Sequence, residues 1–170
     1  MGNEHIFEIT SARVANARER SVSPIYVSTF QTVRDENPAA KTDYFKISTE
    51  YRNTAKENMF VAGHKVTCAI TVDVKKDADY VMIQVPIPAG CSYDVKTKRA
   101  YGEAHREYYK NQVNIYINRL NRGRYTYEFE LMPKYTGSFT LNPAKAEPMY
   151  LPLMYGNNEV KKVKIVGEAK

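Results

Sequence analysis

Apolar and polar residues alternate along most of the chain with a period of two, the spacing that places side chains on one face of a β-strand. The clearest run is KVTCAITVDV at residues 65–74, in which one face is entirely apolar. That face carries Val66, Cys68, Ile70, Val72 and Val74. Alternation or a short apolar run predicts further strands at 24–34, 44–52, 80–85, 112–118, 125–131, 136–141 and 160–166, the last with its lysines outward.

Turn residues between these runs predict two hairpins. DENPAAK at 35–41 joins the first two predicted strands. The glycine-containing LNRGR at 120–124 joins the strands at 112–118 and 125–131, whose apolar faces we expect to form the centre of the core. The polar stretch 94–112 leaves room for one short helix.

Seven or more short strands without a sustained 3.6-residue period predict an all-β fold, an antiparallel β-sandwich. A closed barrel is the alternative architecture. A chain of 170 residues can bury enough surface to fold without a metal or a disulfide. Residues 1–23 do not follow the strand pattern. We expect them to be a linker or the end of a preceding domain, and the sandwich to span residues 24–170.

The net charge of +6, from 25 basic and 19 acidic residues, does not indicate a nucleic-acid site. The basic residues cluster at turns and strand faces, whereas a protein that tracks phosphates needs a contiguous basic stripe. The sequence contains no run of 18 apolar residues, so we do not expect direct membrane insertion.

The two cysteines, Cys68 and Cys91, stand 23 residues apart without metal-ligand spacing. The strand pattern places Cys68 in the core as an inert thiol, since burial disfavours the thiolate. A disulfide between the two cysteines stays open at this point. We expect no metal and no cofactor.

Two groups of residues could carry chemistry. His105 lies between Glu103 and Glu107 in GEAHREYY and could act as a base, although we favour an exposed loop histidine. A tyrosine platform for glycan or peptide is the second candidate, although packing between strands explains most tyrosines better. Its residues are Tyr108, Tyr109, Tyr116, Tyr125 and Tyr127. We therefore assign no catalytic, cofactor-binding or metal site and do not expect an enzyme.

Three ordered motifs carry a resemblance to a known family. PIPAG at 86–90, NQVNIYINRLNRGRYTYEFEL at 111–131 and TGSFTLNPAKAEPMYLPLMYGN at 136–157 resemble the C-terminal domain of bacterial alpha-2-macroglobulin-like proteins. The matching residues are Pro86, Pro88, Ala89, Gly90, Leu120, Gly123, Tyr125, Gly137, Phe139, Pro143, Ala144, Ala146, Glu147, Met149 and Tyr150. Met132, Pro133 and Leu151 depart from the family pattern.

The stretch PAKAEPMY at 143–150 is the most specific of these motifs. Alternation predicts Ala144, Ala146 and Met149 towards the core and Lys145 and Glu147 outward. Its two prolines fit an edge strand or the ends of a strand.

The resemblance implies an immunoglobulin-like or macroglobulin-like sandwich that acts in interdomain docking and conformational change within a large protease-trapping envelope protein. It implies the periplasm or the cell surface as location, other domains of the parent chain as partners, proteases met through the full-length protein, and a monomer in isolation. The family's Cys-Gly-Glu-Gln thioester is not in this chain, so Cys68 and Cys91 do not supply it. The alternative is a stand-alone glycan- or peptide-binding module of the cell envelope.

Overall fold

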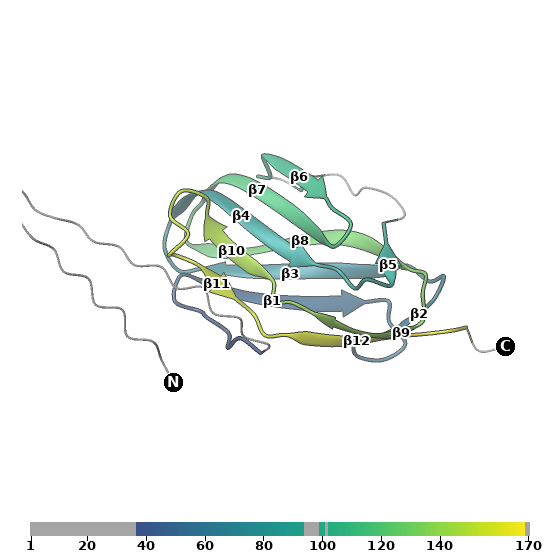
Figure 1. Ribbon diagram of the computed structural model, residues 1–170. Helices are drawn as coiled ribbons and strands as arrows, with labels where there is room; N and C mark the ends of the chain where they lie inside the picture. The colour runs from purple at the N-terminus through teal and green to yellow at the C-terminus, as the bar shows by residue number, and fades with distance from the viewer. Residues whose placement is uncertain (1–36, 94–98, 101, 169–170) are drawn as a thin grey trace, which may run out of the picture. The chain divides into compact units, whose positions relative to one another are not determined.

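The computed structural model describes residues 37–93, 99–100 and 102–168 (Figure 1). The predicted strand at 24–34 and the linker at 1–23 lie outside these residues, and so does the pairing of that strand with 44–52. The described part of the chain contains twelve β-strands and no helix. The strands are β1 (Phe45–Arg52), β2 (Met59–Val61), β3 (Val66–Val74), β4 (Ala78–Pro86), β5 (Cys91–Ser92), β6 (His105–Tyr108), β7 (Gln112–Leu120), β8 (Gly123–Pro133), β9 (Gly137–Leu141), β10 (Lys145–Pro148), β11 (Gly156–Asn157) and β12 (Lys161–Val166).

The strands form three sheets, two of which pack face to face as a sandwich (Figure 1). One sheet has the strand order β1-β3-β8-β5 and the other has β11-β10-β4-β7-β6. A smaller sheet, β2-β12-β9, contributes a second apolar cluster. Every strand pair is antiparallel except β2 with β12. The predicted antiparallel sandwich is confirmed, and the barrel alternative is wrong.

The core lies between the inner faces of the two larger sheets. β3 contributes the apolar face that its alternation predicted, and the sulfur-bearing Cys68 within it is fully buried. β4 lies between β10 and β7 in its sheet and buries Val81, Ile83 and Val85 on alternate positions. The largest fully buried side chains are Phe45, Phe60, Phe129, Ile70, Ile83, Ile115, Leu120, Leu131, Ile165, Val66, Val72 and Val81.

β7 and β8 do not form the predicted hairpin. β7 pairs with β4 and β6, whereas β8 pairs with β3 and β5 in the opposite sheet. The apolar faces of the two strands therefore meet across the core and not side by side. The crossing is held by Tyr125, whose hydroxyl donates to the backbone oxygen of Asn121 at 3.1 Å, and by Asp77, which accepts from the Arg122 backbone N–H at 2.7 Å.

The short helix allowed within 94–112 is not found in the described residues of that stretch, and residues 94–98 and 101 lie outside them. His105–Tyr108 forms β6, an edge strand paired with β7. Arg106 points inward and is buried, while its neighbour His105 is exposed. This alternation of faces is strand geometry.

The PAKAEPMY motif forms β10, with two exceptions to the predicted faces. Ala144 and Ala146 are buried as predicted. Glu147 is buried instead of outward, and Lys145 Nζ lies 2.5 Å from its carboxylate. Met149 is exposed instead of inward. It follows Pro148, the last residue of β10, and strict alternation places it on the face of Lys145 and Glu147, away from that of Ala144 and Ala146.

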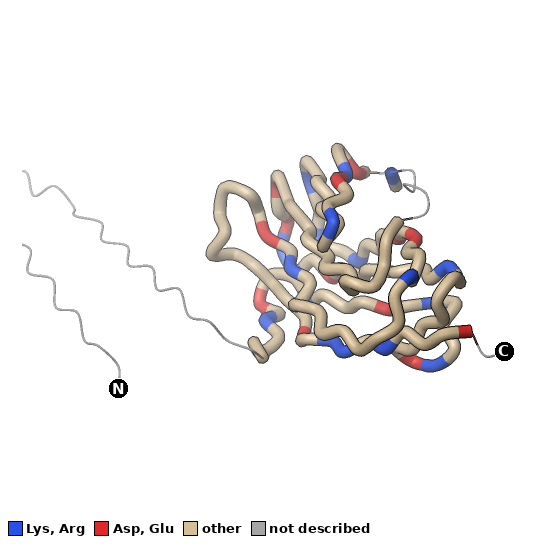
Figure 2. The backbone as a smooth tube through the Cα atoms, turned by 45° about the vertical axis from the view of Figure 1, so that its right-hand side comes forward, with Lys and Arg blue, Asp and Glu red and all other residues tan. Residues whose placement is uncertain are grey.

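Opposite charges pair across the strands of the four-stranded sheet. On its outer face Arg52 lies 2.7 Å from Glu128, and Arg124 lies 2.6 Å from Asp73. Basic and acidic positions are interspersed along the described residues, which show no continuous basic stripe (Figure 2). No helix among the described residues is long and apolar enough to span a membrane.

Candidate functional site

A hydrogen-bonded cluster of polar side chains lies on the outer face of the five-stranded sheet, around Glu107 of β6. The hydroxyl of Tyr109 donates to Oε2 of Glu107 at 2.5 Å, and the hydroxyl of Tyr116 in β7 donates to the same oxygen at 2.8 Å. His105 Nε2 lies 3.7 Å from the other carboxylate oxygen, and its ring stacks on Tyr116 with centroids 6.0 Å apart. The structure therefore brings four of the sequence candidates together.

Glu103, the other acidic candidate, lies with Arg106 on the inner side of β6. Arg106 Nε donates to one Glu103 oxygen at 2.9 Å, and its Nη2 pairs with the other. Its Nη1 donates to the backbone oxygen of Glu128 in the opposite sheet at 2.8 Å. The two side chains are only 1% and 0% exposed, so this pair fastens the edge strand β6 to the facing sheet.

The five tyrosines do not form one platform. Tyr108 points away from Tyr109 and packs edge-on against Tyr93, with ring centroids 4.9 Å apart. Tyr125 and Tyr127 belong to β8 in the other sheet and pack against the core. Only Tyr109 and Tyr116 share the outer face with Glu107, so the packing interpretation holds for the other three.

The electrostatics of the cluster do not favour base catalysis by Glu107. Hydrogen bonds from Tyr109 and then Tyr116 hold the pKa of the Glu107 carboxyl below its ordinary value. The same interaction with Glu107 raises the pKa of Tyr109 to about 12. A carboxylate with a lowered pKa is a weaker base, and Tyr109, its first donor, holds its proton more tightly.

Replacing Tyr109 by Phe should raise the pKa of Glu107 towards its ordinary value, because the strongest donor to the carboxylate is removed. A carbon-detected NMR titration of the Glu107 carboxyl measures this shift. Since the folded pKa is the lower one, ionised Glu107 stabilises the fold above its unfolded pKa, and this contribution is lost as the pH falls through the folded pKa. Tyr135→Phe, at an exposed tyrosine, is the control. An unchanged Glu107 titration in Tyr109→Phe would contradict the assignment.

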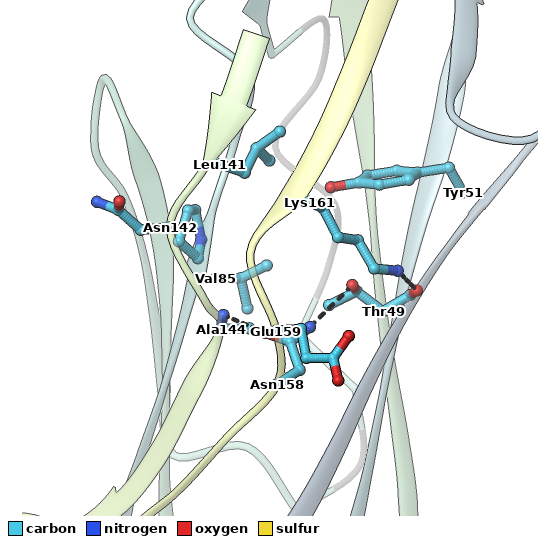
Figure 3. A pocket seen from close by; sticks show the side chains of 10 residues that line it. Thr49, Tyr51, Val85, Leu141, Asn142, Ala144, Asn158, Glu159 and Lys161 are labelled. Atoms are coloured by element: carbon cyan, nitrogen blue, oxygen red, sulfur yellow. Dashed lines mark hydrogen bonds between the residues drawn. The ribbon is translucent and has the colours of Figure 1, made fainter. Parts of the chain in front are cut away.

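A narrow pocket lies where β1 approaches the segment before β12 (Figure 3). Asn158 donates to Thr49 Oγ1 at 3.1 Å and accepts from the Ala144 backbone N–H at 2.6 Å. Lys161, expected to point outward, instead donates to the Thr49 backbone oxygen, and burial lowers the pKa of its ammonium group. The cavity volume of about 10 Å³ is at the lower limit for admitting one water, so this pocket does not accommodate a substrate, and its hydrogen bonds tie strands together.

Both cysteines are free thiols, so the disulfide left open by the sequence is not formed. Burial raises the pKa of Cys68 and of Cys91 to about 12. The reactive thiolate is therefore disfavoured at neutral pH. The residues that the structure describes contain no group of three or more His, Cys, Asp or Glu side chains that could hold a metal ion.

The connection between β10 and β11 exposes a run of apolar side chains, residues 149–154, here called the apolar loop. Tyr150 and Leu153 are 75% and 72% exposed, and Tyr80 packs edge-on against Tyr150 with ring centroids 5.5 Å apart. Five of the seven large hydrophobic side chains exposed in the described residues belong to this loop or to Tyr80. Such a concentration of exposed apolar side chains is typical of an interaction surface.

The apolar loop has defined turns. The Leu151 N–H donates to the Pro148 oxygen at 3.1 Å, and the Met154 N–H donates to the Leu151 oxygen at 3.0 Å. Sequence reasoning missed this surface because it placed Met149 towards the core with Ala144 and Ala146. The available signal was MYLPLMY at 149–155, an apolar run with an internal proline and no charged residue.

Residues 30–152 match the model of the bacterial alpha-2-macroglobulin MG10 domain. The chain belongs to this family. No curated protein matches it in sequence.

Solved structures of similar fold include bacterial alpha-2-macroglobulins. A mutant of Salmonella alpha-2-macroglobulin superposes with a TM-score of 0.66 at 13% identity, over 76% of this chain and 10% of that protein. Native Escherichia coli alpha-2-macroglobulin, spanning MG7 to the C-terminus, superposes with a TM-score of 0.64 at 12% identity, over 75% of this chain and 24% of that chain. The major pilin subunit BcpA of Bacillus cereus superposes with a TM-score of 0.50 at 12% identity, over 72% of this chain and 40% of that chain. At these identities the likeness shows the fold alone.

Two motifs of this MG10 domain meet in one contact. A Cβ atom added at Gly90 of PIPAG would lie 2.6 Å from the ring of Phe139 and 2.7 Å from the backbone oxygen of Tyr135. At Gly137 an added Cβ would lie 3.3 Å from the same ring. The Gly90 oxygen also accepts the backbone N–H groups of Lys134 and Tyr135 at 2.8 and 3.1 Å. The glycines are required for close packing, so these motif residues serve the fold.

Proposed function

We propose that this MG10 domain is a non-catalytic docking domain of a bacterial alpha-2-macroglobulin-like protein, and that the apolar loop docks against another domain of the same chain. The exposed side chains of Tyr150, Leu151 and Leu153 carry this proposal. The free energy falls when another protein surface covers an uncharged apolar surface and removes it from water.

The length of the relatives indicates that the docking partner is another domain of the same chain. The chain spans 10% of the Salmonella protein and 24% of the E. coli fragment, so in those proteins the corresponding domain is one part of a much longer chain. The outer face of the four-stranded sheet, with its paired charges, is suited to water. The apolar loop is therefore the better candidate for an interdomain contact.

The role that we propose for the full-length protein is taken from the relatives of similar fold. E. coli alpha-2-macroglobulin is activated by porcine elastase and by trypsin. We extend this to an endopeptidase inhibitor in the periplasm or on the cell surface, in which proteolysis changes the contacts of this domain. Proteases would meet the full-length protein, and the isolated domain would be a monomer without a catalytic site or a cofactor.

Hydrogen exchange in the full-length gene product tests the docking proposal. The peptide covering residues 149–155 should exchange about tenfold more slowly there than in the 170-residue chain, because docking buries the loop. A Tyr150→Ser, Leu153→Ser double variant should abolish this difference and leave the stability of the isolated domain nearly unchanged, since both side chains are exposed.

Tyr135→Ser is the matched control, because Tyr135 is equally exposed but lies outside the loop. It should preserve the slow exchange. Equal exchange of residues 149–155 in the gene product and in the 170-residue chain would overturn the proposal. A gene that encodes no further macroglobulin domain would overturn it as well.

A further inference from the structure

Tyr80 has an unusual backbone conformation for its residue type. Three non-glycine residues in the described part of the chain have positive φ, and the other two are asparagines, which tolerate this region. Tyr80 has a φ of 52° inside strand β4. The ladder with β7 pairs Asp79 with Arg119 and Val81 with Ile117, but leaves Tyr80 without a paired residue. The backbone is therefore strained at Tyr80, and the β4–β7 ladder lacks one residue pair there.

Burial does not explain this conformation, because half of Tyr80 remains exposed. Both its backbone and its ring contact the apolar loop. The Tyr80 backbone oxygen accepts the N–H of Met149 at 2.8 Å, and the Tyr80 ring packs edge-on against Tyr150 at an interplanar angle of 82°. One strained residue thus holds both the backbone at the start of the loop and its most exposed aromatic ring.

We infer that Tyr80 is a positioning residue that fixes the apolar loop in its docking conformation, so that Tyr150 is presented before the partner domain arrives. This inference rests on the proposed docking function. A pre-ordered loop loses less conformational entropy on contact, which favours docking. The partner surface that suits this arrangement is a shallow apolar recess for one aromatic side chain, since Tyr150 is held by its neighbour and exposed on its remaining sides.

Three variants of the 170-residue chain separate positioning from ordinary structural support. Tyr80→Phe keeps the ring, whereas Tyr80→Asn and Tyr80→Gly remove the ring and tolerate the left-handed backbone. Asn and Gly should leave the unfolding midpoint equal to or above that of the wild-type chain, since the strain is relieved. Both should accelerate amide exchange at Leu151 and Met154 by about tenfold, whereas the Met149 N–H keeps its bond to the backbone oxygen of residue 80. Phe should preserve the wild-type exchange.

Unchanged exchange of the Leu151 and Met154 amides in Tyr80→Asn and Tyr80→Gly would overturn the inference. Failure of both variants to fold, or a lowered midpoint with exchange raised throughout the domain, would also overturn it, because Tyr80 would then support the fold as a whole. Exposure of the wild-type loop in the full-length gene product would refute docking but leave the result in the 170-residue chain unaffected. The two failures are therefore distinguishable.

Discussion

An Arg106→Ala domain should unfold about 3–5 kcal/mol more easily than the wild-type chain, because the substitution leaves the Glu103 carboxylate buried without its counter-ion. Neither side chain of the pair has more than 1% of its surface exposed. The Glu128 backbone oxygen also loses the hydrogen bond that Arg106 donates at 2.8 Å. A loss of this size is a large share of the stability of an ordinary domain. Urea unfolding followed by tyrosine fluorescence measures it.

Two controls show whether the loss comes from the unpaired buried charge. A Glu103→Leu, Arg106→Met double variant should recover most of the stability, because similar volume is retained and no charge remains buried. Arg119→Ala should cost less than about 1 kcal/mol, since Arg119 lies 3.7 Å from Asp77 in an exposed pair. A loss in the double variant as large as in Arg106→Ala would show that the charge is not the cause.

Strand positions were predictable from the sequence because burial on one face leaves a period-two pattern. β8 is buried on alternate residues, as the alternation of 125–131 required, and β3 follows the alternation of 65–74 except at Ala69, which is also buried. Strand partners were not predictable in the same way. A side-chain pattern states which face is inward but does not identify the neighbouring strand. β7 and β8 both have apolar faces and a short connection, and this describes an arch between sheets as well as a hairpin.

The same period explains which site residues the structure brings together. Glu107 and His105 are two residues apart and share the outer face, whereas Arg106 between them points inward. Glu103 precedes β6 and reaches the inner side through its bond to Arg106, a contact that spacing alone does not specify. The apolar loop was missed for a related reason. Its exposed residues follow no period, and only the three-dimensional structure shows that Tyr80 of β4 lies beside Tyr150.

A Gly156→Ala substitution should be among the most damaging changes in this domain. A Cβ atom at Gly156 would lie 2.0 Å from the backbone oxygen of Phe45 and 3.0 Å from that of Lys41. These are backbone atoms of β1 and of the segment before it, so no side chain can rotate away. We expect a loss of about 3 kcal/mol or more in the free energy of unfolding, which is the upper range for overpacking.

The position of Gly156 gives this prediction a local signature. Asn157 exchanges two backbone hydrogen bonds with Lys41, at 3.1 and 3.0 Å, and Gly156 pairs with Ala146 of β10. Displacing β11 should therefore accelerate amide exchange at Lys41 and Asn157 beyond the average for the domain. Gly167→Ala is the control, since no atom lies within 4 Å of a Cβ there and stability should stay within about 0.5 kcal/mol. An unfolding midpoint of Gly156→Ala equal to that of Gly167→Ala would rule out the close approach of β1 and β11.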